Sequence, residues 1–255
     1  MIAGRVYPAI GSSLGVYSCT MNATNPAPPV ASEHSTTSVA SGASAGHPGV
    51  DELFALLAYG EVAAFYRLTD EARMAPNLRG RINMATMAAA EMNHYEVLRD
   101  ALERRGVDVV PAMTKYASAL ENYHRLTTPS TWLEALVKTY IGDALAADFY
   151  LEIASSLPAE VADVVREVLS ETGHSQFVVA EVRAAVTASD KQRHRLALWS
   201  RRLLGEAITQ AQYVLAEHDE LVDLVMTSGE GLSQMTEFFE RLQRTHSARM
   251  HELGL

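Results

Sequence analysis

From Val50 onward, hydrophobic residues recur every three to four positions, which is the periodicity of amphipathic helices. No alternating pattern typical of strands stands out. Proline or glycine lies near each interruption, so the pattern predicts an all-α chain of helices with short connections. The predicted helices span residues 50–73, 77–105, 130–156, 159–187, 190–218 and 230–252, with breaks near Pro76, Gly106, Pro129, Pro158 and Gly229.

The connection between the second and third predicted helices, residues 106–130, is much longer than the others. Such a length suits a crossover between two helical hairpins, so we predict a four-helix bundle with one long crossover. The bundle core covers about residues 50–187, and two additional C-terminal helices follow within residues 190–252. Together they form one helical domain over residues 50–255.

The N-terminal part of the chain does not share this pattern. Residues 22–49 are rich in Pro, Ser, Thr, Ala and Gly, a composition that cannot offset the entropy cost of ordering. Residues 1–49 are therefore predicted to be a disordered tail. The first 19 residues faintly resemble a lipoprotein signal, although proline and glycine break their apolar segment, and Met21 is an alternative translation start.

Composition and charge narrow the functional classes. The chain has 255 residues, of which 48% are hydrophobic, and this is enough to bury a full core. A formal net charge of -10 gives no broad footprint for nucleic acid, although a local basic patch at Arg193, Arg195, Arg201 and Arg202 leaves that alternative open. A single cysteine and the lack of an apolar run of about 20 residues favour a cytoplasmic protein without a membrane segment.

Two predicted helices carry a Glu-x-x-His motif on their apolar stripe. One motif is in "MAAAEMNHYEVL" and the other in "VLSETGHSQFVV". Residues on the first stripe are Met84, Met87, Glu91, His94 and Leu98, and those on the second are Val164, Val168, Glu171, His174 and Val178. A third copy, Glu121 to His124, lies in the crossover just before the helix-breaking "TTPS", and we interpret it as a chance match.

An internal repeat raises the first two motifs above chance. "AYGEVAAF" carries Glu61, 30 residues before Glu91, and "YIGDALAA" carries Asp143, 28 residues before Glu171. Each half therefore has a glycine, a carboxylate and then Glu-x-x-His, so all four bundle helices turn a carboxylate inward.

Electrostatics decides what such a core can contain. Four ionised carboxylates in an apolar interior repel one another, and each unpaired buried charge is costly. The stripes themselves carry no Lys or Arg, whereas two divalent ions with neutral imidazoles balance the charge. Carboxylate oxygen with imidazole nitrogen suits iron or manganese rather than structural zinc, so the sequence predicts a two-metal site.

One carboxylate from each of two helices and Glu-x-x-His from each of two others is the pattern of ferritin-like di-iron carboxylate bundles. Over about residues 50–220 the chain resembles the actinobacterial ferritin-like proteins related to the tRNA hydroxylase that acts on methylthio-isopentenyl-adenosine. The resemblance rests on "LLAYGEVAAFYRL", "MAAAEMNHYEVLRDAL", "LVKTYIGDALAADFY" and "VLSETGHSQFVV". It implies a ferritin-like fold and six metal ligands, which are Glu61, Glu91, His94, Asp143, Glu171 and His174.

The resemblance also implies the chemistry. Two iron ions, or manganese instead, are bridged by Glu91 and Glu171 and activate dioxygen with electrons from an external donor such as a ferredoxin or flavin reductase. The expected activity is a monooxygenase that hydroxylates a tRNA or a small molecule. Asp143 departs from the family's glutamate and is one methylene shorter, and Asp148 and Glu152 are weaker alternatives because they point away from its stripe.

Other functions and supporting residues stay open at this level. One alternative is a ferritin-like protein that oxidises iron or consumes peroxide, and another is a metal-free helical interaction protein. A homodimer is a further alternative. Glu206, Tyr59 and Tyr150 are candidates for support around the ligands, with ordinary packing as the competing interpretation. Five histidines are expected at the surface or in helix caps, namely His124, His194, His218, His246 and His251.

Overall fold

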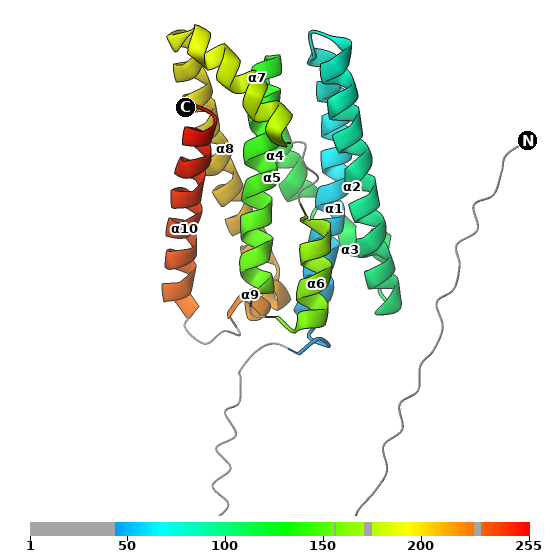
Figure 1. The fold of residues 1–255 in the computed structure, drawn as a ribbon. Coiled ribbons are helices and arrows are strands. Elements are labelled where there is room, and N and C mark those ends of the chain that lie inside the picture. Colours follow the sequence, from blue (N-terminus) through cyan, green and yellow to red (C-terminus); the bar gives the residue numbers. More distant parts are fainter. Residues whose placement is uncertain (1–43, 156, 171–174, 227–230) are drawn as a thin grey trace, which may run out of the picture. The chain divides into compact units, whose positions relative to one another are not determined.

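The computed structural model describes residues 44–155, 157–170, 175–226 and 231–255. These residues form helices and no strand, which confirms the predicted all-α class (Figure 1). The elements are α1 (Pro48–Glu71), the 3-10 helix η1 (Ala72–Met74), α2 (Leu78–Arg104), α3 (Val109–Thr114), α4 (Ala117–Leu126), α5 (Trp132–Ala154), α6 (Ala159–Val168), α7 (Ser175–Ala188), α8 (Asp190–Glu217), α9 (Asp219–Met226) and α10 (Gly231–Glu252). No helix in the described part of the chain is long and apolar enough to cross a membrane.

Side-chain caps and one glycine set several helix ends. Asn77 caps α2 by accepting a hydrogen bond from the backbone of Gly80 at 2.8 Å, and Thr131 caps α5 in the same way. Gly106, with a φ of 76°, ends α2 in the left-handed conformation that suits glycine. The predicted tail falls mostly outside the described residues, but His47 already caps α1, so the helical domain begins slightly before residue 50.

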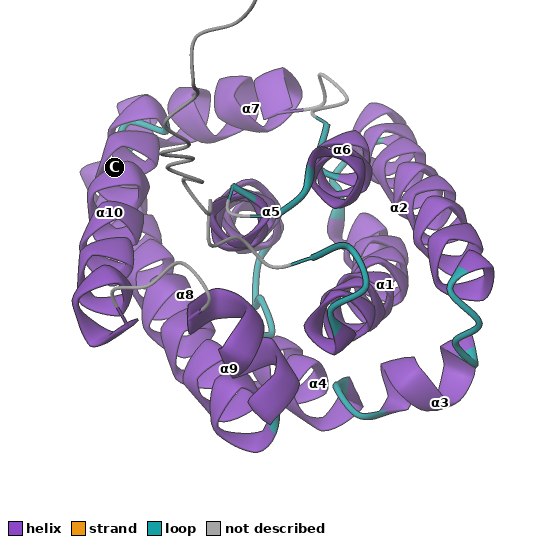
Figure 2. Ribbon diagram, turned by 90° about the horizontal axis from the view of Figure 1, so that it is seen from below, coloured by secondary structure: helices purple, strands orange, loops and turns teal. Residues whose placement is uncertain are grey.

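The bundle is built around α5. Helices α1 and α2 form an antiparallel hairpin, and α5 contacts α1, α6, α7, α8 and α10 (Figure 2). The predicted long crossover does connect α2 to α5, but it folds into α3 and α4, and α4 packs against α1 and α8.

The C-terminal region contains one helix more than predicted. Helices α8, α9 and α10 stand where two were expected. At His218 the backbone leaves the helical conformation, with φ of -132° and ψ of 89°, and this separates α8 from α9.

The prediction of one helix over residues 159–187 is wrong. Helix α6 ends at Val168, where the backbone of Leu169 leaves helical geometry, and α7 begins at Ser175. The helix has therefore ended before Ser170, a residue of low helix propensity. The stripe expected from Val164 to Val178 therefore does not run along a single helix.

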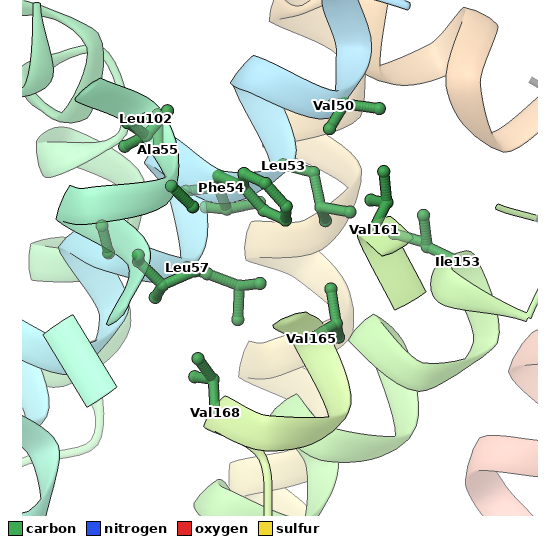
Figure 3. Close-up of a cluster of buried hydrophobic side chains, with 14 of the residues drawn as sticks. Val50, Leu53, Phe54, Ala55, Leu57, Leu102, Ile153, Val161, Val165 and Val168 are labelled. Carbon is green, nitrogen blue, oxygen red and sulfur yellow. The ribbon is translucent and has the colours of Figure 1, made fainter. Parts of the chain in front are cut away.

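Two apolar clusters hold the helices together. The first joins α1, α2, α5 and α6 and includes Leu53, Phe54, Leu102, Ile153 and Val165 (Figure 3). The second joins α1, α2, α5, α7, α8 and α10 and includes Met84, Leu136, Val182, Leu203 and Phe238. Burial of each large side chain contributes about 1.5–3 kcal/mol.

The gap between these clusters locates the polar site. Along α1, the buried residues of the first cluster stop at Ala58 and those of the second begin at Leu68. Along α2, those of the second cluster stop at Ala88 and those of the first begin at Leu98. Between these limits Glu61 and Arg67 of α1 and Glu91 and His94 of α2 face the interior beside Ala64 and Ala90, so a polar layer lies between the two apolar clusters.

Candidate metal centre

The hairpin of α1 and α2 brings three of the predicted ligands together. Glu61 comes from α1, and Glu91 and His94 come from α2. His94 Nδ1 lies 3.4 Å from Glu61 Oε2 and 3.7 Å from Glu91 Oε2. One candidate ligand atom from each residue lies within 4.8 Å of the other two, and no other group of three such side chains occurs among the described residues.

Mutual interactions shift the pKa values of all three groups. Burial raises the pKa of Glu61 well above its usual range. Hydrogen bonds to Glu61 and Glu91 raise the pKa of His94 to about 10. Burial alone would raise the pKa of Glu91, but hydrogen bonds with His94 and Glu61 and the charge of Arg67 outweigh it and lower that pKa. His94 therefore holds a proton at neutral pH, which a metal ion must displace.

The donor set fits a divalent transition metal. Carboxylate and imidazole ligands suit iron or manganese. At metal–ligand distances of about 2.0–2.2 Å, the ligand atoms around a tetrahedral ion are roughly 3.4 Å apart. The distances of His94 Nδ1 from Glu61 and Glu91, 3.4 and 3.7 Å, are close to that value, so small side-chain shifts would let the three residues hold one ion.

The fourth predicted ligand, Asp143 of α5, is paired with an arginine. Arg67 of α1 donates from Nη2 to Asp143 Oδ1 at 3.2 Å. From Nη1 it donates to Thr139 Oγ1 at 3.0 Å and to Glu71 Oε2 at 3.1 Å. Because the Arg67 side chain is only 8% exposed, these contacts fix its guanidinium inside the bundle.

Asp143 nevertheless faces the interior space of the bundle. Its side chain is 43% exposed, but protein surrounds it and the exposed surface faces a cavity. Burial raises the pKa of Asp143 to about 7, the charge of Arg67 opposes this, and Glu91 adds to it.

A second buried cation completes this network. Lys138 Nζ lies 3.7 Å from Glu71 Oε1, and its side chain is 2% exposed. Burial lowers the pKa of Lys138 to about 8. The predicted charge balance was therefore incomplete, because Arg67 and Lys138 stand next to stripe residues and their long side chains reach the interior.

The alternative ligands on α5 are also paired, with arginines of α10. Arg249 donates from Nη2 to Asp148 Oδ1 at 2.7 Å, and Glu152 forms an ion pair with Arg241. Both carboxylates thus point towards α10, as expected from their helical positions.

A cavity of about 760 Å³ adjoins the three converging ligands. Glu61, Glu91 and His94 line it, together with Asp143 and Tyr150. Much of the remaining wall is apolar. The space lies beside the donor set, so a small molecule could be held next to a bound ion.

The crossover helix α4 closes one side of this cavity, which the sequence analysis missed. Leu120, Tyr123 and His124 line the wall. A Cβ at Gly60 would lie 3.7 Å from Leu120, and one at Gly142 would lie 3.6 Å from the Tyr123 hydroxyl, so α4 lies over the glycines of the internal repeat. The clue in the sequence was the third Glu-x-x-His motif, which marks an amphipathic helix here and not a ligand group.

Two histidine predictions are wrong because their helices pack inward. His124 lines the cavity, and burial lowers its pKa to about 2. His246 of α10 is buried at 3% exposure. By contrast, His218 lies at the end of α8, and His194 and His251 are exposed.

The three residues predicted to support the ligands, Tyr59, Tyr150 and Glu206, lie in different surroundings. Tyr150 lines the cavity. Burial raises its pKa, and the negative charge of Glu61 adds a smaller increase. Tyr59 instead donates a hydrogen bond to Glu121 of α4 at 2.8 Å. Glu206 is half-buried on α8 and does not line the cavity.

The remaining two predicted ligands, Glu171 and His174, lie outside the described residues. Their assignment stays a prediction.

Comparison with known families agrees with this architecture. A family model described as a ferritin-like domain of actinomycetes matches residues 46–228, which run from the start of α1 to the end of α9. The match therefore includes the hairpin of α1 and α2 and most of the cavity wall. A search of curated proteins finds no match.

Proposed function

The chain belongs to the family of actinomycete ferritin-like domains, and on this premise we propose that it is an oxygen-dependent, non-haem iron oxidoreductase. One observation supports the proposal most strongly: Glu61, Glu91 and His94 converge beside a cavity. Catalytic metal sites differ from structural ones in keeping a position open for substrate, and the adjoining space would provide it.

Each of the three residues has a role in this proposal. Glu61, Glu91 and His94 would hold the ion, and iron bound there would supply the chemistry of oxygen activation. His94 Nδ1 must lose its proton before it can act as a ligand. Glu61, whose own pKa is raised by burial, must likewise be ionised to act as a ligand, so both protons leave the site when the ion binds.

The cavity wall would control access to the centre. Leu57, Met87 and Phe149 present apolar surface, and Tyr150 adds a hydroxyl-bearing ring. An apolar wall limits water around the centre and protects reactive species from side reactions.

Within this class, the finer proposal is a hydroxylase of the tRNA-hydroxylase-like type. The cavity volume of about 760 Å³ falls within the range of small-molecule sites, about 300–1,000 Å³. The net charge of -10 does not favour tRNA, so a small-molecule substrate is the simpler choice. A ferredoxin or flavin reductase as electron donor, a homodimer and a cytoplasmic location stay predictions.

The second candidate is iron oxidation or peroxide consumption. The same three ligands support it, but neither activity needs a cavity of this size. Of the predicted second set of ligands, only Asp143 is described, and it is paired with Arg67. The proposal therefore rests on Glu61, Glu91 and His94.

The test combines iron binding with oxygen consumption. Protein loaded anaerobically with Fe(II) would be mixed with oxygen and a chemical reductant in an oxygen electrode. Glu91→Ala should lose both iron binding and oxygen uptake while circular dichroism remains helical. Glu121→Gln is the matched control, because Glu121 belongs to a Glu-x-x-His motif outside the ligand group, and it should retain both.

Two results would redirect the proposal. Unchanged iron content in Glu91→Ala would contradict the site. Many irons per chain in a closed assembly of many subunits would instead favour storage.

A further inference from the structure

We propose that Arg67 supplies the positive charge that a second metal ion would otherwise supply, so that the centre holds one ion per chain. Asp143 then serves as the anchor of Arg67 and not as a metal ligand. This inference rests on the proposed function, because it takes Glu61, Glu91 and His94 as the ligands of the single ion.

The contacts of Arg67 indicate that Asp143 stays paired with it. Its guanidinium bonds to Asp143, Thr139 and Glu71 at 3.0–3.2 Å, and the side chain is nearly buried. If Asp143 turned to a metal ion, the buried guanidinium would keep Glu71 but lose one of its two carboxylate partners, which is unfavourable. The geometry therefore favours Asp143 remaining with Arg67.

Helix α5 offers no unpaired carboxylate in its place. Asp143 pairs with Arg67, Asp148 with Arg249, and Glu152 with Arg241. By contrast, neither Glu61 nor Glu91 forms an ion pair with any lysine or arginine of the described chain. The α1–α2 hairpin thus presents carboxylates for a metal, whereas α5 presents carboxylates that arginines already hold.

The count of charges gives the same result. Four carboxylates belong to the candidate ligand group and the ion-pair network beside it, namely Glu61, Glu71, Glu91 and Asp143. Arg67 and Lys138 contribute two positive charges. Among the described residues, one divalent ion with a neutral His94 brings this group to neutrality; Glu171 lies outside them and is not part of the count.

The test is the number of ions bound, which does not depend on activity. Protein would be titrated with Fe(II) without oxygen, and iron per chain would be measured by mass spectrometry after gel filtration. Wild type and Asp143→Asn should each bind one ion, with affinities within threefold in a chelator competition. Two ions in wild type, falling to one in Asp143→Asn, would overturn the inference.

A second pair of variants tests the role of Arg67. Arg67→Gln releases Asp143 and removes a positive charge, so it should gain a second ion, and Arg67→Gln with Asp143→Asn should lose that ion again. Arg249→Gln is the matched control, because Arg249 also pairs with an aspartate of α5, and it should keep one ion. If folded Arg67→Gln still binds only one ion, Arg67 does not replace the charge of a second metal ion.

The proposed function and the inference about Arg67 can fail separately. Glu91→Ala should bind no iron at this centre. If it binds iron like the wild type, the proposed function fails. If it loses iron but wild type binds two ions that need Asp143, only the inference about Arg67 fails. Circular dichroism would verify folding in every variant, and the Asp143→Asn comparison decides the inference even if Arg67→Gln does not fold.

Discussion

Metal binding at this centre should depend strongly on pH because His94 must give up a proton. Hydrogen bonds to Glu61 and Glu91 raise the pKa of His94 to about 10. At pH 7, three units below that value, competition by the proton weakens metal affinity about 10³-fold, equivalent to about 4 kcal/mol. Apparent affinity should therefore rise by at least about tenfold per pH unit between pH 6 and 9.

Chelator competition with Fe(II) under anaerobic conditions measures this slope. Calorimetry in two buffers with different ionisation enthalpies counts the released protons independently, and at least one is expected at pH 7. An affinity that is constant from pH 6 to 9, with no proton release, would refute the assignment of His94 as a ligand.

The same shift predicts an opposite trend for folding stability without metal. The pKa of His94 rises from 6.5 when unfolded to about 10 when folded, so protonation favours the folded state. This contribution is complete below pH 6.5 and is lost as the pH rises towards 10. In chelator-treated protein, the His94 contribution to the free energy of unfolding, isolated by comparison with His94→Gln, should fall over that interval. An unchanged difference between the two proteins would contradict the pKa shift.

Two further predictions concern the scaffold. Gly49→Ala should lower the free energy of unfolding by about 1–3 kcal/mol, because its new methyl group would contact the backbone of Glu220 and lie 2.8 Å from Leu224 Cβ; an unchanged thermal midpoint would contradict this packing of α9 on α1. Leu53→Ala, in the fully buried first cluster, should cost about 2–5 kcal/mol. Leu198→Ala, at a side chain that is 66% exposed, should cost less than about 0.5 kcal/mol. Equal losses in the two leucine variants, measured by chemical denaturation, would contradict the assigned core.

The sequence was sufficient to predict that Glu61, Glu91 and His94 come together. A period of 3.6 residues puts Glu91 and His94 on one face of α2, and a short connection returns this face to α1 and Glu61. The all-α class followed from the same periodicity. Membership in the ferritin-like family, expected from the motifs, is confirmed by the family match over residues 46–228.

The side of the site around α5 could not be predicted from helical periodicity. Arg67 and Lys138 lie beside the stripes, and only the fold shows that their long side chains reach inward. The break between α6 and α7 and the packing of α4 over the cavity are also tertiary features. A stripe identifies residues that face a core, but it does not identify their ion-pair partners.

Anomalous diffraction at the iron absorption edge, from crystals grown anaerobically with Fe(II), tests the central claim most directly. The account predicts a peak about 2.0–2.2 Å from ligand atoms of Glu61, Glu91 and His94. No peak at these residues, in crystals of protein shown to contain iron, would contradict it.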